Sequence, residues 1–204
     1  MALIEITNLN IKLGNRLVVN NFSATLSAGT ITAIIGPNGS GKSTLIAALA
    51  GDLPVSSGSI AIDGVGINTM SLRETAALRS VVLQSRNYWL AYSVREVIAM
   101  GQGPAEIARI DLVLDQLDMA SFADQSVTTL SGGQAQRVEI ARALIRDSDI
   151  YLLDEPLSAQ DSSSKERIIQ VLQDLRASGK TIVVIAHSEV SALDWCDQLF
   201  NLGS

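Results

Sequence analysis

The chain has 204 residues, enough for one large or two small domains whose core needs no disulfide or metal staple. Its 15 basic and 21 acidic side chains give a net charge of −6, which argues against a nucleic-acid partner. A single cysteine, Cys196, excludes an internal disulfide framework and is typical of a reducing compartment. Neither a signal peptide nor an apolar run of membrane-spanning length is evident, so we expect a cytoplasmic protein.

Short apolar segments separated by Asn, Gly and Ser turns predict strands in the first sixty residues. These strands are Leu3–Ile6, Arg16–Val19, Phe22–Leu26, Thr30–Ile35 and Ser59–Ile62. Some alternate polar and apolar residues, as in an antiparallel sheet with one exposed face. Residues 30–35 are apolar almost throughout, which predicts a strand buried on both faces. A helix is predicted from Ser43 to about Ala50.

The pattern from Ser71 to Leu117 is helical, and strands and helices alternate beyond it. Ser71 is a suitable N-cap, with Glu74 at the capping-box position. The predicted helices are Leu72–Arg79, Val94–Met100, Ala105–Leu117, Gly132–Arg146 and Ser162–Ala177, and the predicted strands are Ile150–Leu153, Thr181–Ala186 and Asp197–Leu202. The alternation favours a parallel sheet, into which the central helical stretch is inserted.

A glycine-rich segment lies between the buried strand and the first helix. It reads Gly36-Pro37-Asn38-Gly39-Ser40-Gly41-Lys42-Ser43-Thr44 and fits the phosphate-loop pattern G-x-x-x-x-G-K-[ST]. Its glycines let the backbone wrap a phosphate, and its N–H groups and the helix N-terminus face the anion. Lys42 can reach the β and γ phosphates, and the Ser43 hydroxyl can bind Mg²⁺.

Two acidic residues, Asp154 and Glu155, end the apolar strand at Ile150–Leu153. The carboxyl ends of parallel strands form the ligand edge of a sheet. There Asp154 would hold the Mg²⁺ side of a nucleotide site, and Glu155 would act as the general base for water. Taken alone, such a pair is equally typical of ordinary turn residues.

The segment Leu130-Ser131-Gly132-Gly133-Gln134 precedes a predicted helix. Together with the phosphate loop and the acidic pair, it makes the sequence resemble the ATP-binding-cassette (ABC) ATPases over essentially its whole length. The resemblance implies an α/β fold with a P-loop NTPase core and a mostly parallel sheet. It further implies an N-terminal antiparallel β-subdomain and an inserted helical subdomain at roughly 85–145, within a single domain spanning 1–204.

The resemblance also implies roles for single residues, with ATP and Mg²⁺ as cofactors. Gln84 matches the family's glutamine that contacts Mg²⁺, and His187 matches the catalytic switch histidine near the γ-phosphate. Asp161 matches the aspartate at the subunit contact. In this family two cassettes pair head to tail, so Ser131–Gln134 would close on ATP held by Lys42 of a second copy.

Two positions depart from the family pattern. Leu13 stands where an aromatic side chain usually stacks on adenine, and we hypothesise weaker discrimination between bases. Gln160 stands where leucine is usual in the loop of the dimer contact, while Asp161 is kept.

The resemblance implies an ATPase subunit that energises transport through separate membrane permease subunits. It would lie on the inner face of the cell membrane, held peripherally by the permease. Residues 78–84 and 92–101 resemble cassettes of metal-chelate and haem importers. An exporter subunit of haem or lipid type and a soluble non-transport ABC ATPase remain alternatives. Residues 86–92 are the expected permease-facing segment, with Tyr88 and Trp89 either exposed anchors or packed inside the helical subdomain.

Overall fold

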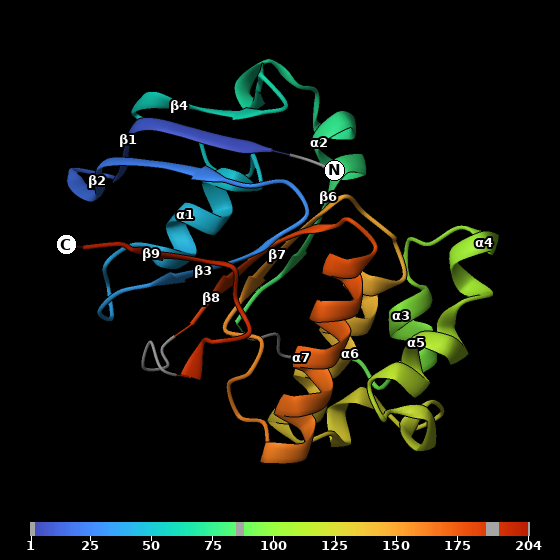
Figure 1. Cartoon of the computed structure of the whole chain (residues 1–204). Coiled ribbons are helices and arrows are strands. Elements are labelled where there is room, and N and C mark those ends of the chain that lie inside the picture. Colours follow the sequence, from blue (N-terminus) through green and yellow to red (C-terminus); the bar gives the residue numbers. More distant parts are fainter. Residues whose placement is uncertain (1–2, 85–87, 187–191, 204) are drawn as a thin grey trace.

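The fold is given by a computed structural model that describes residues 3–84, 88–186 and 192–203. It contains two sheets with helices between and beside them (Figure 1). This arrangement confirms the predicted α/β class with an antiparallel N-terminal sheet, a parallel core sheet and an inserted helical lobe.

The antiparallel sheet consists of β1 (Ile4–Leu13), β2 (Arg16–Leu26), β4 (Ser57–Ile62) and β5 (Val65–Gly66), in the order β2-β1-β4-β5. The sequence predicted two strands in place of β2, and that prediction was wrong. Asn21 adopts a left-handed φ of 48°, so the chain passes the two asparagines and continues pairing with β1 after a shift in register. Asn8 does the same in β1, with a φ of 46°.

The core sheet is parallel throughout and has the order β6-β7-β8-β3-β9. Its strands are β3 (Ile31–Ile35), β6 (Arg79–Val82), β7 (Ile150–Asp154), β8 (Thr181–Ile185) and β9 (Gln198–Asn201). Strand β6 corrects the expectation of helix throughout 71–117. Helix α2 (Leu72–Leu78) has the predicted Ser71–Glu74 capping box, but Val81 and Val82 continue the chain as an extended segment beside β7.

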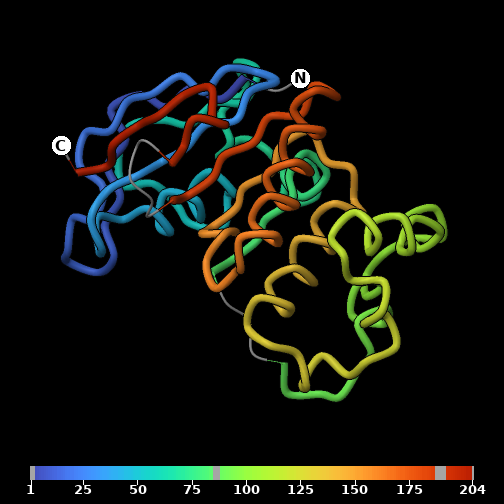
Figure 2. The backbone as a smooth tube through the Cα atoms, turned by 60° about the horizontal axis from the view of Figure 1, so that its bottom comes forward, coloured from blue at the N-terminus to red at the C-terminus, as the bar shows by residue number. Residues whose placement is uncertain are grey.

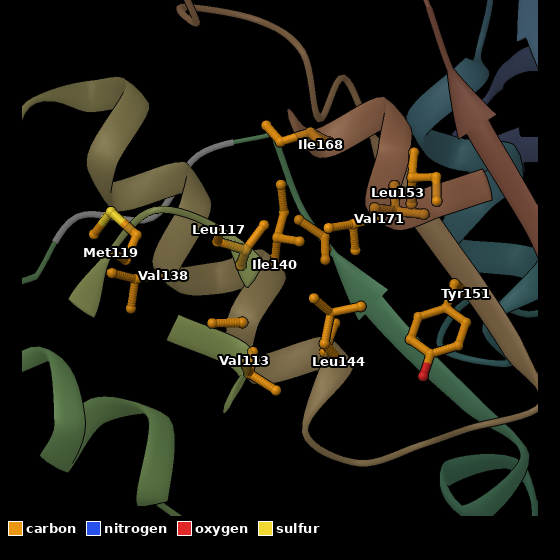
Figure 3. Close-up of a cluster of buried hydrophobic side chains, with 14 of the residues drawn as sticks. Val113, Leu117, Met119, Val138, Ile140, Leu144, Tyr151, Leu153, Ile168 and Val171 are labelled. Atoms are coloured by element: carbon orange, nitrogen blue, oxygen red, sulfur yellow. The ribbon is translucent and has the colours of Figure 1, made fainter. Parts of the chain in front are cut away.

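The strands of the core sheet alternate their side chains between two hydrophobic layers. In β7, Ile150 and Leu152 face the antiparallel sheet and α1 (Lys42–Leu49), whereas Tyr151 and Leu153 face the opposite layer. That second layer packs against α6 (Gly132–Leu144) and α7 (Ser162–Ala177) (Figure 3). Burial on both faces explains why this strand is apolar along its whole length.

The helical subdomain forms a lobe to one side of the core (Figure 2). It contains α3 (Val94–Ala99), α4 (Pro104–Ile107), α5 (Ile110–Gln116) and the 3₁₀ turns Ala120–Phe122 and Val127–Thr129; a further 3₁₀ turn, Ile67–Thr69, lies outside it. The single helix predicted for 105–117 is divided at 108–109. The division separates α4, which buries none of its residues, from α5, which packs Ile110, Val113 and Leu114 into the core.

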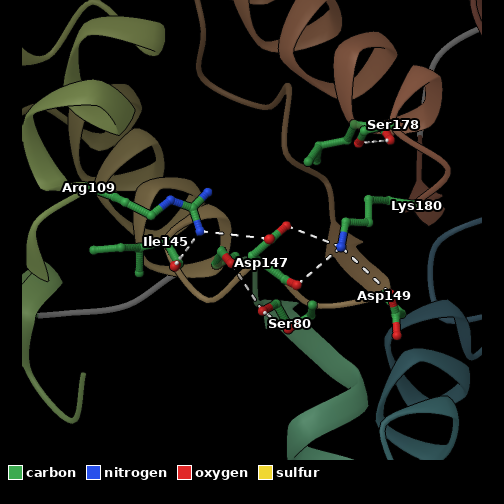
Figure 4. Close-up of polar contacts among 10 residues, drawn as sticks. Ser80, Arg109, Ile145, Asp147, Asp149, Ser178 and Lys180 are labelled. Atoms are coloured by element: carbon green, nitrogen blue, oxygen red, sulfur yellow. Dashed lines mark hydrogen bonds and ion pairs between the residues drawn. The ribbon is translucent and has the colours of Figure 1, made fainter. Parts of the chain in front are cut away.

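Polar contacts fix the turn that joins α6 to β7 (Figure 4). Asp147, with a φ of 52°, pairs with Lys180 at 3.1 Å and with Arg109 of the helical lobe at 3.9 Å. Beneath them, the buried Ser80 hydroxyl donates to the Ala143 carbonyl oxygen at 3.0 Å. The turn therefore connects the lobe, the end of α6 and the start of the strand that carries the acidic pair. Among the residues described, no helix is long and apolar enough to cross a membrane.

Candidate functional site

The phosphate loop joins β3 to α1, as the sequence predicted. Gly39 and Gly41 have φ values of 77° and 97°, which side-chain-bearing residues rarely adopt. A Cβ atom on Gly41 would lie 2.8 Å from Cγ1 of Val18. The loop thus needs glycine at this position for both its backbone conformation and its fit against β2.

Lys42 begins helix α1 and is almost fully buried in the curve of the loop. Its ammonium donates to the carbonyl oxygens of Gly36 at 2.8 Å and Pro37 at 3.0 Å. The positive charge is therefore held inside the loop, where a phosphate oxygen would be the stronger acceptor. Ser43, the next residue, is exposed at the first turn of the helix.

The acidic pair ends the strand two places away from β3. Asp154 is 2% exposed and lies beside Ile185 of β8, while Glu155 turns out of the strand with a φ of 52°. The left-handed conformation of Glu155 is uncommon for a side-chain-bearing residue and typical of functional sites. Gln84 follows β6, the neighbour of β7 on its other side.

These strand ends border one pocket of about 860 Å³, a volume in the range of small-ligand sites. Lys42, Ser43, Thr44, Gln84 and Glu155 line it together with Leu13, Arg16, Val18, Asn38, Gly39 and Gly41. The structure therefore gathers nine of the predicted site residues at this pocket, from β1, the phosphate loop and the segments that follow β6 and β7. Asp154 lies at the same sheet edge but does not line the pocket.

Leu13 and Arg16 line this pocket from the β1–β2 hairpin. They are paired across the β1–β2 hairpin, whose turn contains Gly14 at a φ of 60°, and Leu13 is 48% exposed. Arg16 was missed by the sequence reasoning. A two-residue turn places its flanking residues opposite each other, and that spacing could have identified Arg16 as the neighbour of Leu13.

The segment Ser131–Gln134, hereafter the signature segment, lies at the start of α6 and does not line the pocket. Ser131 caps the helix: its hydroxyl accepts from the Gln134 N–H at 3.2 Å, and the Gln134 side chain accepts from the Ser131 N–H at 2.8 Å. Gly132 faces open space. Within one chain, the signature segment and the phosphate loop therefore belong to separate surfaces.

Asp161 is likewise outside the pocket and caps α7. Its carboxylate accepts from the Ser164 N–H at 2.7 Å and the Ser163 hydroxyl at 2.9 Å. The hydrogen bond from the Ser164 backbone lowers the pKa of Asp161 most, followed by the bond from Ser163. His187, the predicted switch histidine, lies outside the described residues, although it follows β8 by two residues.

The two aromatic residues left open by the sequence differ in their surroundings. Tyr88 packs against the hydrophobic core, and its hydroxyl donates to Glu139 of α6. Trp89 is 88% exposed. Tyr88 thus matches the packed alternative and Trp89 the exposed one.

The oxygen donors in and beside the pocket suit a hard cation that takes further ligands from phosphate and water. Ser43, Gln84 and Asp154 offer a hydroxyl, an amide and a carboxylate oxygen. Within the described residues, no group of three or more His, Cys, Asp and Glu side chains could hold a metal ion. The donor set fits Mg²⁺, which usually keeps several waters and binds substrate phosphates.

A phosphate loop between a buried parallel strand and a helix, with acids ending a neighbouring strand, defines a P-loop nucleoside triphosphatase. Residues 19–158 match the family model described as "ABC transporter". The chain is 32% identical to the hemin import ATP-binding protein HmuV of Streptomyces coelicolor, across 96% of this chain and 73% of that protein. It is also 32% identical to the zinc transport system ATP-binding protein TroB of Treponema pallidum, across 98% and 77%.

Solved structures agree with this assignment. A bacterial Atm1-family ABC exporter with ATP bound superposes with a TM-score of 0.89 at 28% identity, over 98% of this chain and 36% of that one. A nucleotide-free ATP-binding cassette superposes with a TM-score of 0.87 at 25% identity, covering 99% and 88%. The chain belongs to the ABC transporter family, and it is an ATPase of that family.

Proposed function

We propose that this ATPase works as a head-to-tail pair and energises uptake of a metal chelate or haem through separate permease subunits. The observation that carries the proposal is the separation of the signature segment from the phosphate loop within one chain. Ser131 caps a helix whose N-terminus favours an anion, yet the pocket that would hold the phosphates is lined by other residues. A second copy brings the two surfaces together.

In this proposal the residues at the pocket divide the work of phosphoryl transfer. Lys42 leaves the loop carbonyls for the β and γ phosphates, and the loop N–H groups surround them. Ser43, Gln84 and Asp154 would hold Mg²⁺, which would supply positive charge next to the phosphate oxygens. Glu155 accepts a proton from the attacking water, and His187 stays a proposed contact of the γ-phosphate.

Replacing Glu155 by Gln tests the assigned base. The amide keeps the size of the side chain but cannot accept the proton, so we expect turnover to fall by about 100-fold or more while ATP binding is retained. Glu166→Gln, on the exposed face of α7, is the matched control. If Glu155→Gln hydrolyses ATP like the parent protein, the catalytic assignment is wrong.

A groove next to the exposed Trp89 supports the proposal that this surface contacts the permease. One part, of about 320 Å³, is lined by Arg79, Arg142, Arg146 and Met100 among others, and the adjoining part by Tyr88, Trp89, Leu90 and Tyr92. Trp89 and Leu90 are 88% and 62% exposed, an arrangement that suits a protein partner. A peripheral position on the inner membrane face follows from such docking.

Co-purification with membranes tests the surface. We expect Trp89→Ala and Leu90→Ala to reduce the membrane-bound fraction severalfold, because an aromatic or aliphatic anchor loses its contact. Leu112→Ala, at an exposed leucine of α5, is the control. Equal retention of all three variants would contradict docking at this groove.

An exporter subunit is the second candidate, supported by the likeness to the Atm1-family exporter. Relatives named for import of hemin and cobalamin, the latter from Halobacterium salinarum at 31% identity, favour uptake instead. Identification of the permease that co-purifies with the chain separates these candidates.

A further inference from the structure

Gln160 is a nearly buried polar residue between the loop that follows β7 and the start of α6. Its exposed fraction is 9%, and its side-chain Nε2 donates to the Gly133 carbonyl oxygen at 2.9 Å. It immediately precedes Asp161, the cap of α7. A single side chain therefore ties the signature segment to residues 155–161, hereafter the acidic loop.

The two segments are in close contact around this bond. A Cβ atom on Gly133 would lie 2.6 Å from the Ala159 carbonyl oxygen and 3.2 Å from Oε1 of Gln160. Ala159 itself has a left-handed φ of 56°. Because that conformation is unfavourable for alanine, the surrounding contacts must hold the loop in place.

The acidic loop begins at Glu155, and hydrogen bonds to the Glu155 backbone hold this end of the loop. The carbonyl oxygen of Glu155 accepts from the Ser158 N–H at 3.1 Å and from the Ser158 hydroxyl at 2.9 Å. Short hydrogen-bonded connections thus run from the proposed general base, through the loop, to the first turn of α6. Gly132, the residue that precedes Gly133, faces open space.

We infer that Gln160 is a positioning residue that holds the signature segment and the acidic loop in one fixed relation, ready to close on a second copy. The inference rests on the head-to-tail pairing proposed above. Without the Nε2 donor, both segments sample more orientations, and closure over ATP must order them again. The entropy lost in that ordering weakens the pairing of two copies. The ATP affinity of the phosphate loop in a single copy does not change.

The chemistry of the amide distinguishes this role from packing. Leucine or methionine can fill a similar volume, but neither donates a hydrogen bond to the Gly133 carbonyl oxygen. A residue that only fills space would be replaced by either with little effect on pairing. A residue that orients the signature segment would not.

The experiment compares variants of the full chain in the Glu155→Gln background, where bound ATP is not consumed. Gln160→Met removes the donor and keeps the length of the side chain. Gln170→Met is the matched control, because Gln170 is exposed on α7 and donates to Asp174 of that helix at 2.9 Å. Sedimentation velocity gives the dimer dissociation constant at saturating Mg-ATP, and a fluorescent ATP analogue at low protein concentration gives the monomer affinity.

We expect Gln160→Met to raise the dimer dissociation constant about tenfold, in line with the loss of one buried hydrogen bond. ATP affinity of the monomer should stay within about twofold, and amide exchange in residues 131–136 should become faster. Gln160→Leu, which introduces the residue usual in the family, should give the same changes as Gln160→Met. It keeps the test valid if the Gln160→Met protein fails to fold. The Gln170→Met protein should match its parent in every measurement.

If Gln160→Met and Gln160→Leu have the same dimer dissociation constant as the parent, the inference is overturned and the proposed function is left intact. A parallel loss of ATP affinity and melting temperature also overturns it, because Gln160 would then only support the fold. Failure of the Glu155→Gln protein itself to pair with ATP overturns both the head-to-tail function and the inference.

Discussion

The carbonyl oxygen of Leu202 occupies the space that a side chain on Gly36 would need. Strand β9 reaches this place by pairing with β3, and the Leu202 N–H donates to the Ile35 carbonyl oxygen at 2.8 Å. The C-terminal strand therefore supports the first residue of the phosphate loop through backbone contact.

Gly36→Ala is expected to destabilise the protein and to weaken ATP binding. The added methyl must displace backbone, not a flexible side chain, and overpacking of this kind costs about 1–3 kcal/mol in addition to the conformational strain of a positive φ. Gly64→Ala is the control, because Gly64 has a φ of 79° with no atom near its Cβ position. Urea denaturation that gives equal losses for the two variants would contradict the Leu202 contact.

The two glycines of the signature segment should respond differently to substitution. Gly133→Ala places a methyl 2.6 Å from the Ala159 carbonyl oxygen and should lower the free energy of unfolding by about 1–3 kcal/mol. Gly132→Ala meets open space and should fold like the parent, but it should lose turnover if that face closes on the partner's nucleotide. Thermal denaturation and ATPase assays separate the effects, and full activity of Gly132→Ala would count against a composite site.

Leu13→Tyr should strengthen ATP binding. The tyrosine ring supplies a stacking surface opposite Arg16 on the pocket wall, and stacking of a base on an aromatic ring is worth about 1–3 kcal/mol. We expect ATP affinity to rise about tenfold, with a smaller gain for triphosphate lacking a base. Titration with ATP, GTP and inorganic triphosphate checks this, and no change in affinity or base preference would contradict the hypothesis about Leu13.

Cys196 should react slowly with alkylating reagents in the folded protein. Burial, followed by the charges of Asp197 and Asp194, raises the pKa of its thiol to about 12, so little thiolate exists at pH 8. Iodoacetamide labelling followed by intact mass should be at least about tenfold slower than in urea. Equal rates in the two conditions would show that the thiol is not shielded.

Asp161 should make the stability of α7 depend on pH in the acid range. Its pKa is lowered in the folded state, chiefly by the hydrogen bond from the Ser164 N–H, so its contribution is present at neutral pH. The contribution is lost as pH falls from about 4 through the lowered pKa. Asp161→Asn keeps a capping oxygen without the charge, so its melting temperature should approach that of the parent as the pH falls from 6 to 3. A gap that is constant with pH would contradict this.

The sequence by itself identified the family, because the residues that bind and hydrolyse ATP lie in short contiguous motifs. The phosphate loop and the acidic pair each depend on local backbone geometry, and both occur where they were predicted. Buried strands follow from continuous apolar runs, and the capping box at Ser71 follows from the residue three places later, so both were predictable as well.

Only the tertiary structure decided features that join distant segments. Strand β6 becomes extended because β7 offers it hydrogen bonds, which outweigh the helical pattern around it. Arg16 enters the pocket through the β1–β2 hairpin, and Gln160 meets Gly133 across the fold. Such contacts depend on the packing of whole elements, which no local pattern encodes. Length and charge placed the chain in a broad class of proteins, and its motifs identified the chemistry. The packing of whole elements determined which residues hold the functional side chains in place.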